Sequence, residues 1–294
     1  MAETRRLAVL VNPTAGAGRA IEALPRVQAE LERLGAEFRT VRTDSAAHAR
    51  KEAAAAADRG ESVAALGGDG LLGTVAGALC GTESALAILP GGRGNDLARV
   101  LGVPVEPEEA ARVAVAGEER PIDVAEVDGR QYVGIASCGF DSDANRIANE
   151  ARLVRGNLVY LYAALRALAA WKHATFEVTV DGERHTVTGY SVIVANSKAY
   201  GGGMYVVPHA ELDDGRLDVM LTEGSSKLNF LKGLPKLFTG SHVDDPHLRF
   251  IRGSQVEVHA DRPFTVYADG DPIGELPVHI RVAPRALRVI VPRS

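Results

Sequence analysis

An apolar run, three glycines around one aspartate and a second apolar stretch follow one another in SVAALGGDGLLGTVAGAL, residues 62–79. The first run predicts a buried strand, and the stretch after the glycines predicts a helix. Glycine leaves the backbone amides open to a ligand, and the N-terminus of a helix adds partial positive charge. The stretch therefore predicts a strand–turn–helix unit whose turn binds phosphate, with Asp69 as its single charge.

The same alternation of strand and helix extends over the first 120 residues. Short apolar runs predict buried strands at 6–12, 37–43, 62–67 and 85–91. Helical patterns lie between them at 20–35 and 45–60, and another follows the glycine cluster. Strands and helices that alternate at this spacing predict a parallel sheet covered by helices on both faces.

From residue 121 onward the hydrophobic pattern changes to a period of two. Asp128-Gly129 and Asp181-Gly182 each lie between two such runs, which predicts two hairpin turns. The region is therefore expected to form an antiparallel β domain. Two helical stretches interrupt it, at 155–172 and 226–240.

Three stretches of this second region each allow two interpretations. Both helical stretches have apolar residues three and four positions apart, which favours helices packed on the sheet, although the same side chains could line a groove for an acyl chain. Three lysines lie in the second of them, Lys227, Lys232 and Lys236. They suit an anionic bilayer, but a packed amphipathic helix with solvated lysines is favoured. The glycine-rich segment 195–204 fits either the border of a cleft or a simple loop.

Composition and charge exclude several classes of protein. The chain has 294 residues and a formal net charge of −5, so no basic field indicates a nucleic-acid partner. Cys80 and Cys138 lack CxxC spacing, which favours buried thiols in a reducing compartment. No N-terminal run fits a signal peptide, and no run of about 18 uncharged apolar residues fits a membrane span. These features predict a cytoplasmic protein without a transmembrane segment.

Three glycine-rich turns follow predicted strands of the first region, at 12–20, 67–70 and 90–96. In a parallel sheet they share the edge at the carboxyl ends of the strands, where ligands bind. Neither a GxxxxGK[ST] loop nor a complete GxGxxG fingerprint is present. Asp69 and Asp96 lie inside the clusters, and Mg²⁺ binds through one or two carboxylates with waters and nucleotide phosphates. The turns therefore predict a site for phosphates and their magnesium.

Five motifs, in this order, resemble the diacylglycerol kinase catalytic-domain family, the bacterial lipid kinases related to sphingosine and ceramide kinases. They are NPTAGAG (12–18), LGGDG (66–70), LPGGRGNDLARVLGVP (89–104), AELDDGRLDVML (210–221) and YADGDPI (267–273). The resemblance runs from residue 7 to 291. It implies an α/β nucleotide-binding domain over 1–120, similar to those of NAD kinases and phosphofructokinases. An antiparallel β-sandwich domain follows over 121–294, with the site between the two.

The resemblance assigns a role to each position that matches a family motif. Asp69 and Asp96 are implied to organise the catalytic Mg²⁺, partly through water. The residues implied to lie against ATP are Asn12, Thr14, Gly16, Thr43, Gly67, Gly68, Asp69, Gly70, Gly92, Arg93, Gly94 and Asn95. A second, structural Mg²⁺ is implied to bind the side chain of Asp214 and the carbonyl oxygens of Glu211 and Arg216.

The chain departs from the family pattern at the proposed reaction centre. The acid after Asp-Gly in the last motif is the family's general base, and here it is Asp271 in place of a glutamate. Leu71, Gly73 and Thr74 stand where the family has threonine, asparagine and glutamate. Arg93 replaces a threonine near the phosphates, and a guanidinium can bind a phosphate through two parallel hydrogen bonds.

These roles predict an ATP- and Mg²⁺-dependent kinase that phosphorylates the hydroxyl of a lipid such as diacylglycerol. Two alternatives stay open, a kinase of a soluble hydroxyl acceptor on the same fold and a nucleotide-binding protein with little kinase activity. If the acceptor is a lipid, the enzyme is expected to act at a membrane surface, which for a cytoplasmic protein is the inner face of the membrane. A homodimer is also left open.

Overall fold

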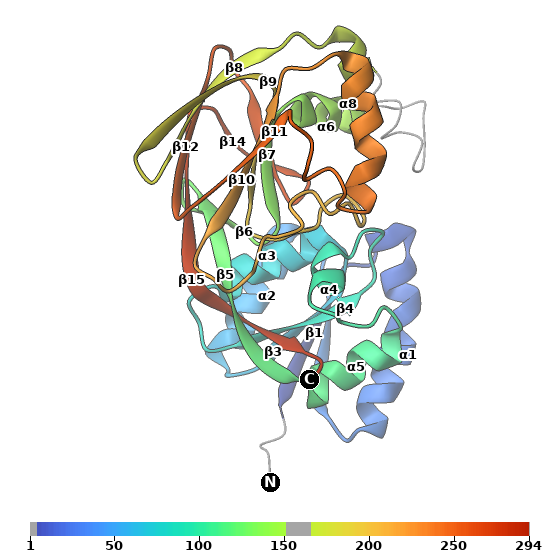
Figure 1. The fold of residues 1–294 in the computed structure, drawn as a ribbon. Helices are drawn as coiled ribbons and strands as arrows, with labels where there is room; N and C mark the ends of the chain where they lie inside the picture. The colour runs from blue at the N-terminus through green and yellow to red at the C-terminus, as the bar shows by residue number, and fades with distance from the viewer. Residues whose placement is uncertain (1–4, 151–165, 294) are drawn as a thin grey trace.

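The structure, a computed structural model, describes residues 5–150 and 166–293. Its N-terminal half contains a parallel sheet in the order β4-β3-β1-β2 (Figure 1). The strands are β1 (Arg6–Val11), β2 (Glu37–Arg42), β3 (Ser62–Gly67) and β4 (Ala85–Pro90). The four strands predicted from the apolar runs are confirmed.

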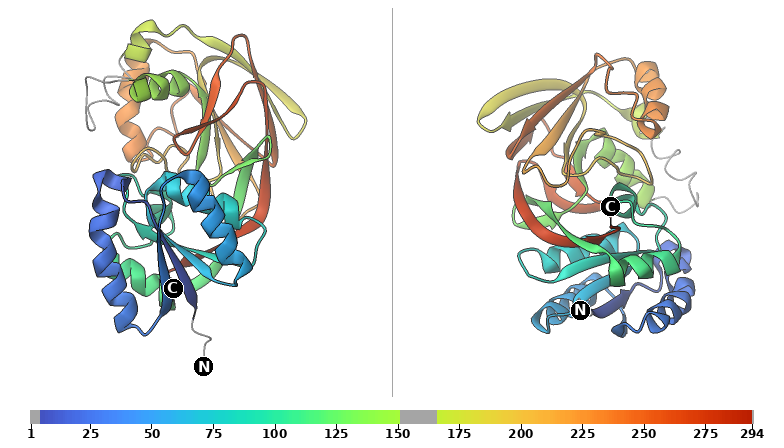
Figure 2. Two further views of the ribbon diagram at one scale, coloured as in Figure 1. Left: turned by 180° about the vertical axis from the view of Figure 1, so that it is seen from behind. Right: turned by 60° about the horizontal axis from the view of Figure 1, so that its bottom comes forward.

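Helices cover both faces of this sheet, as predicted. They are η1 (Ala15–Ala17), α1 (Arg19–Arg33), α2 (Ala46–Asp58), α3 (Asp69–Leu79), α4 (Asp96–Val100) and α5 (Pro107–Ala116). α1 packs with α5 on one face and α2 packs with α3 on the other (Figures 1 and 2). α2 begins after Ser45, whose hydroxyl accepts the N–H of His48 at 3.1 Å.

The second half is built of antiparallel strand pairs, which confirms the predicted sandwich class. Its strands are β5 (Glu118–Val127), β6 (Arg130–Tyr132), β7 (Ile135–Gly139), β8 (Ala174–Val180), β9 (Glu183–Ala195), β10 (Leu217–Glu223), β11 (Leu248–Gly253), β12 (Gln255–Ala260), β13 (Thr265–Ala268), β14 (Asp271–Glu275) and β15 (Val278–Val291). Both predicted Asp-Gly turns have positive φ at each residue, the geometry of a type I′ hairpin.

Two helical elements lie beside these strands. α6 (Phe140–Glu150) follows β7, and α8 (Lys227–Gly233) continues into η2 (Leu234–Phe238). Of the helix predicted over 155–172, residues 155–165 lie outside the described part of the chain, and residues 166–170 are helical. Among the described residues, no helix is both long and apolar enough to cross a bilayer.

A ribbon of β5 and β15 joins the two halves. β15 pairs with β12 at its start and with β4 near its end, so it joins the parallel strands and the antiparallel strands into one continuous sheet. Asp123 of β5 is fully buried, and its carboxylate accepts the N–H groups of Gly215 and Arg285, each at 2.7 Å. The domain boundary expected at residue 120 falls inside β5 and stays a prediction.

Candidate active site

The glycine-rich turns pack directly against one another at the carboxyl edge of the parallel sheet. The N–H of Gly91 donates to the carbonyl of Gly67 at 2.8 Å. A Cβ at Gly68 would lie 3.2 Å from Cα of Gly92, and a Cβ at Gly16 would collide with the carbonyl oxygen of Gly91. Several of these glycines are therefore required by the contact between the loops, in addition to any contact with a ligand.

Gly70 lies beside Asp271 and is not packed against the other glycine-rich turns. It is exposed at the first turn of α3, and a Cβ there would meet one atom within 4 Å, Oδ2 of Asp271 at 3.8 Å. Within the described part of the chain, the N–H of Gly70 has no acceptor. Gly70 at the first turn of α3 and the carboxylate of Asp271 thus lie close together, and both are exposed.

Asp69 holds the start of α4. Its two carboxylate oxygens accept the N–H groups of Asn95 at 3.0 Å and Asp96 at 2.9 Å. Burial raises the pKa of Asp69, and the nearby charge of Asp96 raises it further. The predicted cation-binding acid is therefore also a cap of a short helix.

Asp96 holds a loop of the second half. Its carboxylate oxygens accept the N–H groups of Gly202 at 2.9 Å and Gly203 at 2.7 Å. Segment 195–204 therefore contacts a predicted site residue, and its role as the border of a cleft stays a prediction. This contact could not be predicted from spacing, because 106 residues separate Asp96 from Gly202.

Asp269 and Asp271 lie on a type I′ turn but differ completely in environment. Asp269 has φ 50°, and its carboxylate accepts the N–H groups of Val133, Gly134 and Ile135 at 3.0–3.3 Å. Burial raises the pKa of Asp269. Asp271 begins β14, is exposed, and makes no hydrogen bond with any described residue. The structural acid of the motif is therefore Asp269, which sequence reasoning did not single out, and Asp271 is left free.

The site concentrates negative charge without a basic partner. Asp69, Asp96, Asp269 and Asp271 form no ion pair within residues 5–150 and 166–293. The same residues contain no cluster of three His, Cys, Asp or Glu side chains arranged to hold a metal ion. Each oxygen of Asp69 and Asp96 accepts one N–H and keeps further acceptor capacity. This donor set fits Mg²⁺ that retains its waters better than an ion enclosed by protein ligands.

Two polar residues of the predicted ATP site shape its first loop. The side-chain oxygen of Asn12 accepts the N–H of Thr14 at 3.1 Å and its hydroxyl at 2.9 Å. Thr43 is buried, and its hydroxyl donates to the carbonyl of Val11 at 3.0 Å. These side chains fix the loop after β1 and the start of the segment after β2.

The loop after β4 presents a free cation. Asn95 has φ 52°, and its side-chain oxygen accepts the N–H of Gly92 at 2.9 Å. Arg93 is exposed and forms neither a hydrogen bond nor an ion pair with another described residue. The N–H groups of Arg93 and Gly94 also lack an acceptor within the described residues. The loop therefore offers two amides and a guanidinium to an anion.

The departures after the GGDG motif do not all face the site. Leu71 is 7% exposed and packs against Gly67 in the core of the α/β half. A Cβ at Gly73 would lie 3.7 Å from Oδ2 of Asp269, so this face of α3 lies close to the β13–β14 turn. The hydroxyl of Thr74 donates to the carbonyl of Gly70 at 2.9 Å. Because its side chain is buried in the core, Leu71 is not among the groups that face a ligand.

The loop predicted to hold a structural ion has a different arrangement. Asp214 is ion-paired with Arg252, whose Nε also lies 3.1 Å from the buried carboxylate of Asp218. Asp214 further accepts the N–H of Arg216 at 3.0 Å, and Glu211 is exposed. Because a guanidinium already neutralises Asp214, this loop does not fit a divalent ion as it stands. The second Mg²⁺ stays a prediction of the resemblance.

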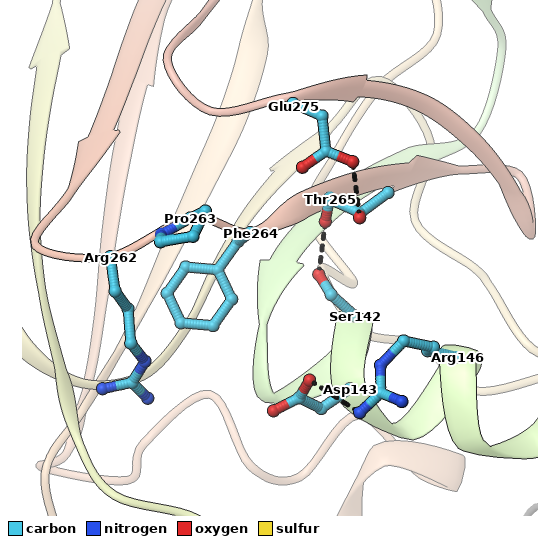
Figure 3. Close-up of a pocket in the computed structure, with 8 residues that line it drawn as sticks. All are labelled: Ser142, Asp143, Arg146, Arg262, Pro263, Phe264, Thr265 and Glu275. Atoms are coloured by element: carbon cyan, nitrogen blue, oxygen red, sulfur yellow. Dashed lines mark hydrogen bonds and ion pairs between the residues drawn. The ribbon is translucent and has the colours of Figure 1, made fainter.

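A pocket of about 320 Å³ lies between α6 and the β13–β14 hairpin (Figure 3). Its lining residues are Ser142, Asp143, Arg146, Arg262, Pro263, Phe264, Thr265 and Glu275. Thr265 donates to Glu275 at 2.7 Å, and Ser142 donates to the carbonyl of Thr265 at 2.7 Å. None of the predicted site residues lines the pocket. It lies at the end of β14 opposite to Asp271.

Comparison with known proteins matches both halves of the chain to one kinase family. Residues 6–127 match the diacylglycerol kinase catalytic domain, and residues 134–291 match the YegS C-terminal NAD kinase beta sandwich-like domain. A crystal structure of a diacylglycerol kinase from Bacillus anthracis has the same fold. It superposes with a TM-score of 0.78 at 22% identity, over 99% of this chain and 98% of that chain.

Sequence relatives extend over almost the whole chain. A protein of Mycobacterium tuberculosis named diacylglycerol kinase is 33% identical, over 99% of this chain and 96% of its own length. A Bacillus subtilis protein of the same name is 27% identical over 99% and 97%. A YegS-like lipid kinase of Pseudomonas aeruginosa is 34% identical over 77% and 75%. Identity of this extent, together with the two domain matches, shows that the chain belongs to the diacylglycerol kinase family and is a kinase.

Proposed function

We propose that this kinase transfers the γ-phosphate of ATP to a hydroxyl group of a lipid, with diacylglycerol as the leading acceptor. The observation that carries the proposal is the free carboxylate of Asp271 opposite Gly70, at the N-terminus of α3. This pair combines a proton acceptor with a place for phosphate. The relatives named diacylglycerol kinase and lipid kinase support a lipid as the acceptor class.

Asp271 is the proposed general base. It follows directly on the turn that Asp269 fixes through three backbone N–H groups, so its backbone is held in place. A base within roughly 3 Å of the acceptor hydroxyl can take its proton as the oxygen attacks the γ-phosphorus. The new O–P bond forms while the bond from phosphorus to the bridging oxygen of ADP breaks.

The loops at the sheet edge are the proposed phosphate site. The N–H groups of Gly70, Arg93 and Gly94 have no acceptor among the described residues, and so they can donate to phosphate oxygens. The guanidinium of Arg93 can add two parallel hydrogen bonds. These groups face the negative charge that spreads over the phosphoryl oxygens in the transition state.

Asp69 and Asp96 are the proposed holders of Mg²⁺, in part through water. Their fit rests on the accumulation of acids without a lysine or arginine partner. Burial raises the pKa of Asp69 most and the charge of Asp96 raises it further, and a cation would relieve that repulsion. Held by these two residues, Mg²⁺ would supply positive charge that offsets the negative charge of the nucleotide phosphates. No role in the reaction is assigned to the loop of Asp214.

The test is phosphate transfer from γ-labelled ATP in the presence of Mg²⁺. Acceptors are diacylglycerol, monoacylglycerol, sphingosine and ceramide in detergent micelles, with glycerol and other polyols as soluble acceptors. A labelled lipid is expected. Labelling of a polyol alone would show that the acceptor is soluble and is not a lipid. Tight ATP binding without transfer to any acceptor would indicate a nucleotide-binding protein with little kinase activity. Location at the inner face of the membrane and a homodimer stay predictions that separate experiments address.

A further inference from the structure

Exposed apolar side chains gather on α8 and η2. Leu228 is 62% exposed and Phe238 is 57% exposed. The one other large apolar side chain with comparable exposure in the described part of the chain is Val105, at 58%, between α4 and α5. The fold leaves Leu228 and Phe238 in contact with water, which is unfavourable because both side chains are apolar.

The inner side of the same helix is firmly packed. Phe230 stacks on Tyr190 with ring centroids 4.2 Å apart and meets the edge of Phe140 at 4.8 Å. Leu231 packs against the core of the sandwich half. The exposure of Leu228 therefore belongs to the outer face of a fixed helix, and not to a detached segment.

The outer face is also positively charged. Three lysines and no acid lie between Glu223 and Asp244, although the whole chain has a net charge of −5. Lys232 and Lys236 form no hydrogen bond or ion pair with residues 5–150 or 166–293, and Lys227 donates to the carbonyl of Ala169 at 2.8 Å. Lys232 and Lys236 thus stay available to an anionic partner.

We propose that the α8–η2 surface binds an anionic lipid bilayer. This surface is defined as Lys227, Leu228, Lys232, Lys236 and Phe238. Exposed apolar side chains with lysines near them suit the boundary between acyl chains and anionic headgroups. Leu228 and Lys232 are four positions apart and so lie on the same face.

The surface is joined to the candidate active site by a short segment. The carbonyl of Leu237 in η2 accepts the N–H of Tyr205 at 2.8 Å. Two residues before Tyr205, Gly203 donates to Asp96 in the site. A bilayer bound at the α8–η2 surface would therefore lie beside the site. This use of the surface rests on the proposed function, whereas the binding itself does not.

The test is co-sedimentation of the full chain with vesicles, without nucleotide. One set of vesicles is phosphatidylcholine, and the other contains about 30% phosphatidylglycerol to give an anionic surface. Leu228→Ser with Phe238→Ser removes the apolar part, and Lys232→Gln with Lys236→Gln removes charge. Val105→Ser and Lys51→Gln are matched controls, since both side chains are exposed elsewhere.

Wild type is expected to bind the anionic vesicles and not the neutral ones. The lysine pair should weaken binding about fivefold for each charge removed. The apolar pair should weaken it about tenfold or more. Both controls should bind as wild type does, and all variants should melt as wild type does because the changes are on the surface.

Three results would overturn the inference. The first is absence of binding by wild type to anionic vesicles, and the second is unchanged binding by both double variants. The third is a dimer of wild type in sedimentation velocity that Leu228→Ser with Phe238→Ser dissociates, because the surface would then bind a second copy. Kinase activity on short-chain diacylglycerol in micelles is measured in parallel. If that activity is absent while vesicle binding follows the expected order, the proposed function fails and the surface assignment stands.

Discussion

The carboxylate of Asp69 accepts the backbone N–H of Asp96 at 2.9 Å. The acid that follows β3 thereby fixes the start of α4, and Asp96 in turn accepts the N–H groups of Gly202 and Gly203. A chain of acid-to-amide bonds thus joins two strand ends of the parallel sheet to a loop of the sandwich half. The same acids that are proposed to hold a cation also determine the shape of the site.

Asp96→Asn is expected to loosen this chain. An amide group has a single acceptor oxygen, so one of the two glycine N–H groups would face a donor, at a cost of about 1–3 kcal/mol in the free energy of unfolding. The pKa of Asp69 should fall, because burial remains but the charge of Asp96 is gone. Urea unfolding and a ¹³C carboxyl titration measure the two effects. Unchanged values of both would contradict the described geometry.

Asp269→Asn is expected to impair both stability and turnover. Three backbone N–H groups of the segment after β6 converge on this carboxylate, and an amide cannot accept all of them. We expect a loss of about 1–3 kcal/mol in the free energy of unfolding. Since Asp269 positions Asp271 and touches no proposed phosphate group, kcat should fall while KM for ATP stays close to wild type. A fall in ATP affinity with unchanged kcat would refute the positioning role.

The hydrophobic pattern and the glycine-rich turns were sufficient to predict the strands and the order of the site loops along the chain. Apolar runs of the length of residues 62–67 fit buried strands, and Asp-Gly pairs between alternating runs fit type I′ turns. Both signals depend on residues that are close together in the sequence, so they predict structure without knowledge of tertiary contacts. Each glycine-rich turn follows a predicted strand of a parallel sheet, which placed the turns at one sheet edge, where the structure brings them into contact.

Contacts between distant segments could not be predicted in this way. Asp123 and Asp269 stand in apolar or turn-forming stretches, and each is explained only by backbone N–H groups far away in the chain. An aspartate between two buried apolar residues, as Asp123 is between Ile122 and Val124, is a signal that could have indicated a buried acceptor. Leu71 stands where the family has threonine, but its side chain packs into the core. Side-chain direction on α3 depends on packing, which spacing alone does not specify.

Arg93→Ala is expected to weaken ATP binding. The guanidinium has no partner among the described residues, so its loss leaves no unpaired group behind and acts through the ligand alone. The KM for ATP should rise about tenfold or more, the usual effect of a lost charge-assisted hydrogen bond. Arg93→Lys should recover part of this loss. Arg50→Ala, another exposed arginine, is the control, and an equal KM in both alanine variants would argue against a phosphate contact.

Asp141→Asn is expected to change how stability depends on pH. Burial raises the pKa of Asp141 to about 6 from its ordinary value of 3.8. The folded state therefore binds this proton more tightly, and the stability gained below about pH 4 is lost as pH rises through about 6. At about pH 8 the variant should be more stable than wild type by up to about 3 kcal/mol, and at about pH 4 it should not be. Urea unfolding at both values tests this, and an equal difference at both would contradict burial as the cause.

The central claim is that Asp271 accepts the proton of the acceptor hydroxyl. The most direct measurement is the rate of phosphate transfer from γ-labelled ATP to diacylglycerol micelles by Asp271→Asn, with Asp58→Asn as an exposed acid distant from the site. Asp271→Asn is expected to lower kcat by about 10²–10⁴ because the general base is lost, with folding and ATP binding retained because the side chain makes no hydrogen bond in the fold. Asp58→Asn should match wild type. Wild-type turnover by Asp271→Asn would contradict the claim.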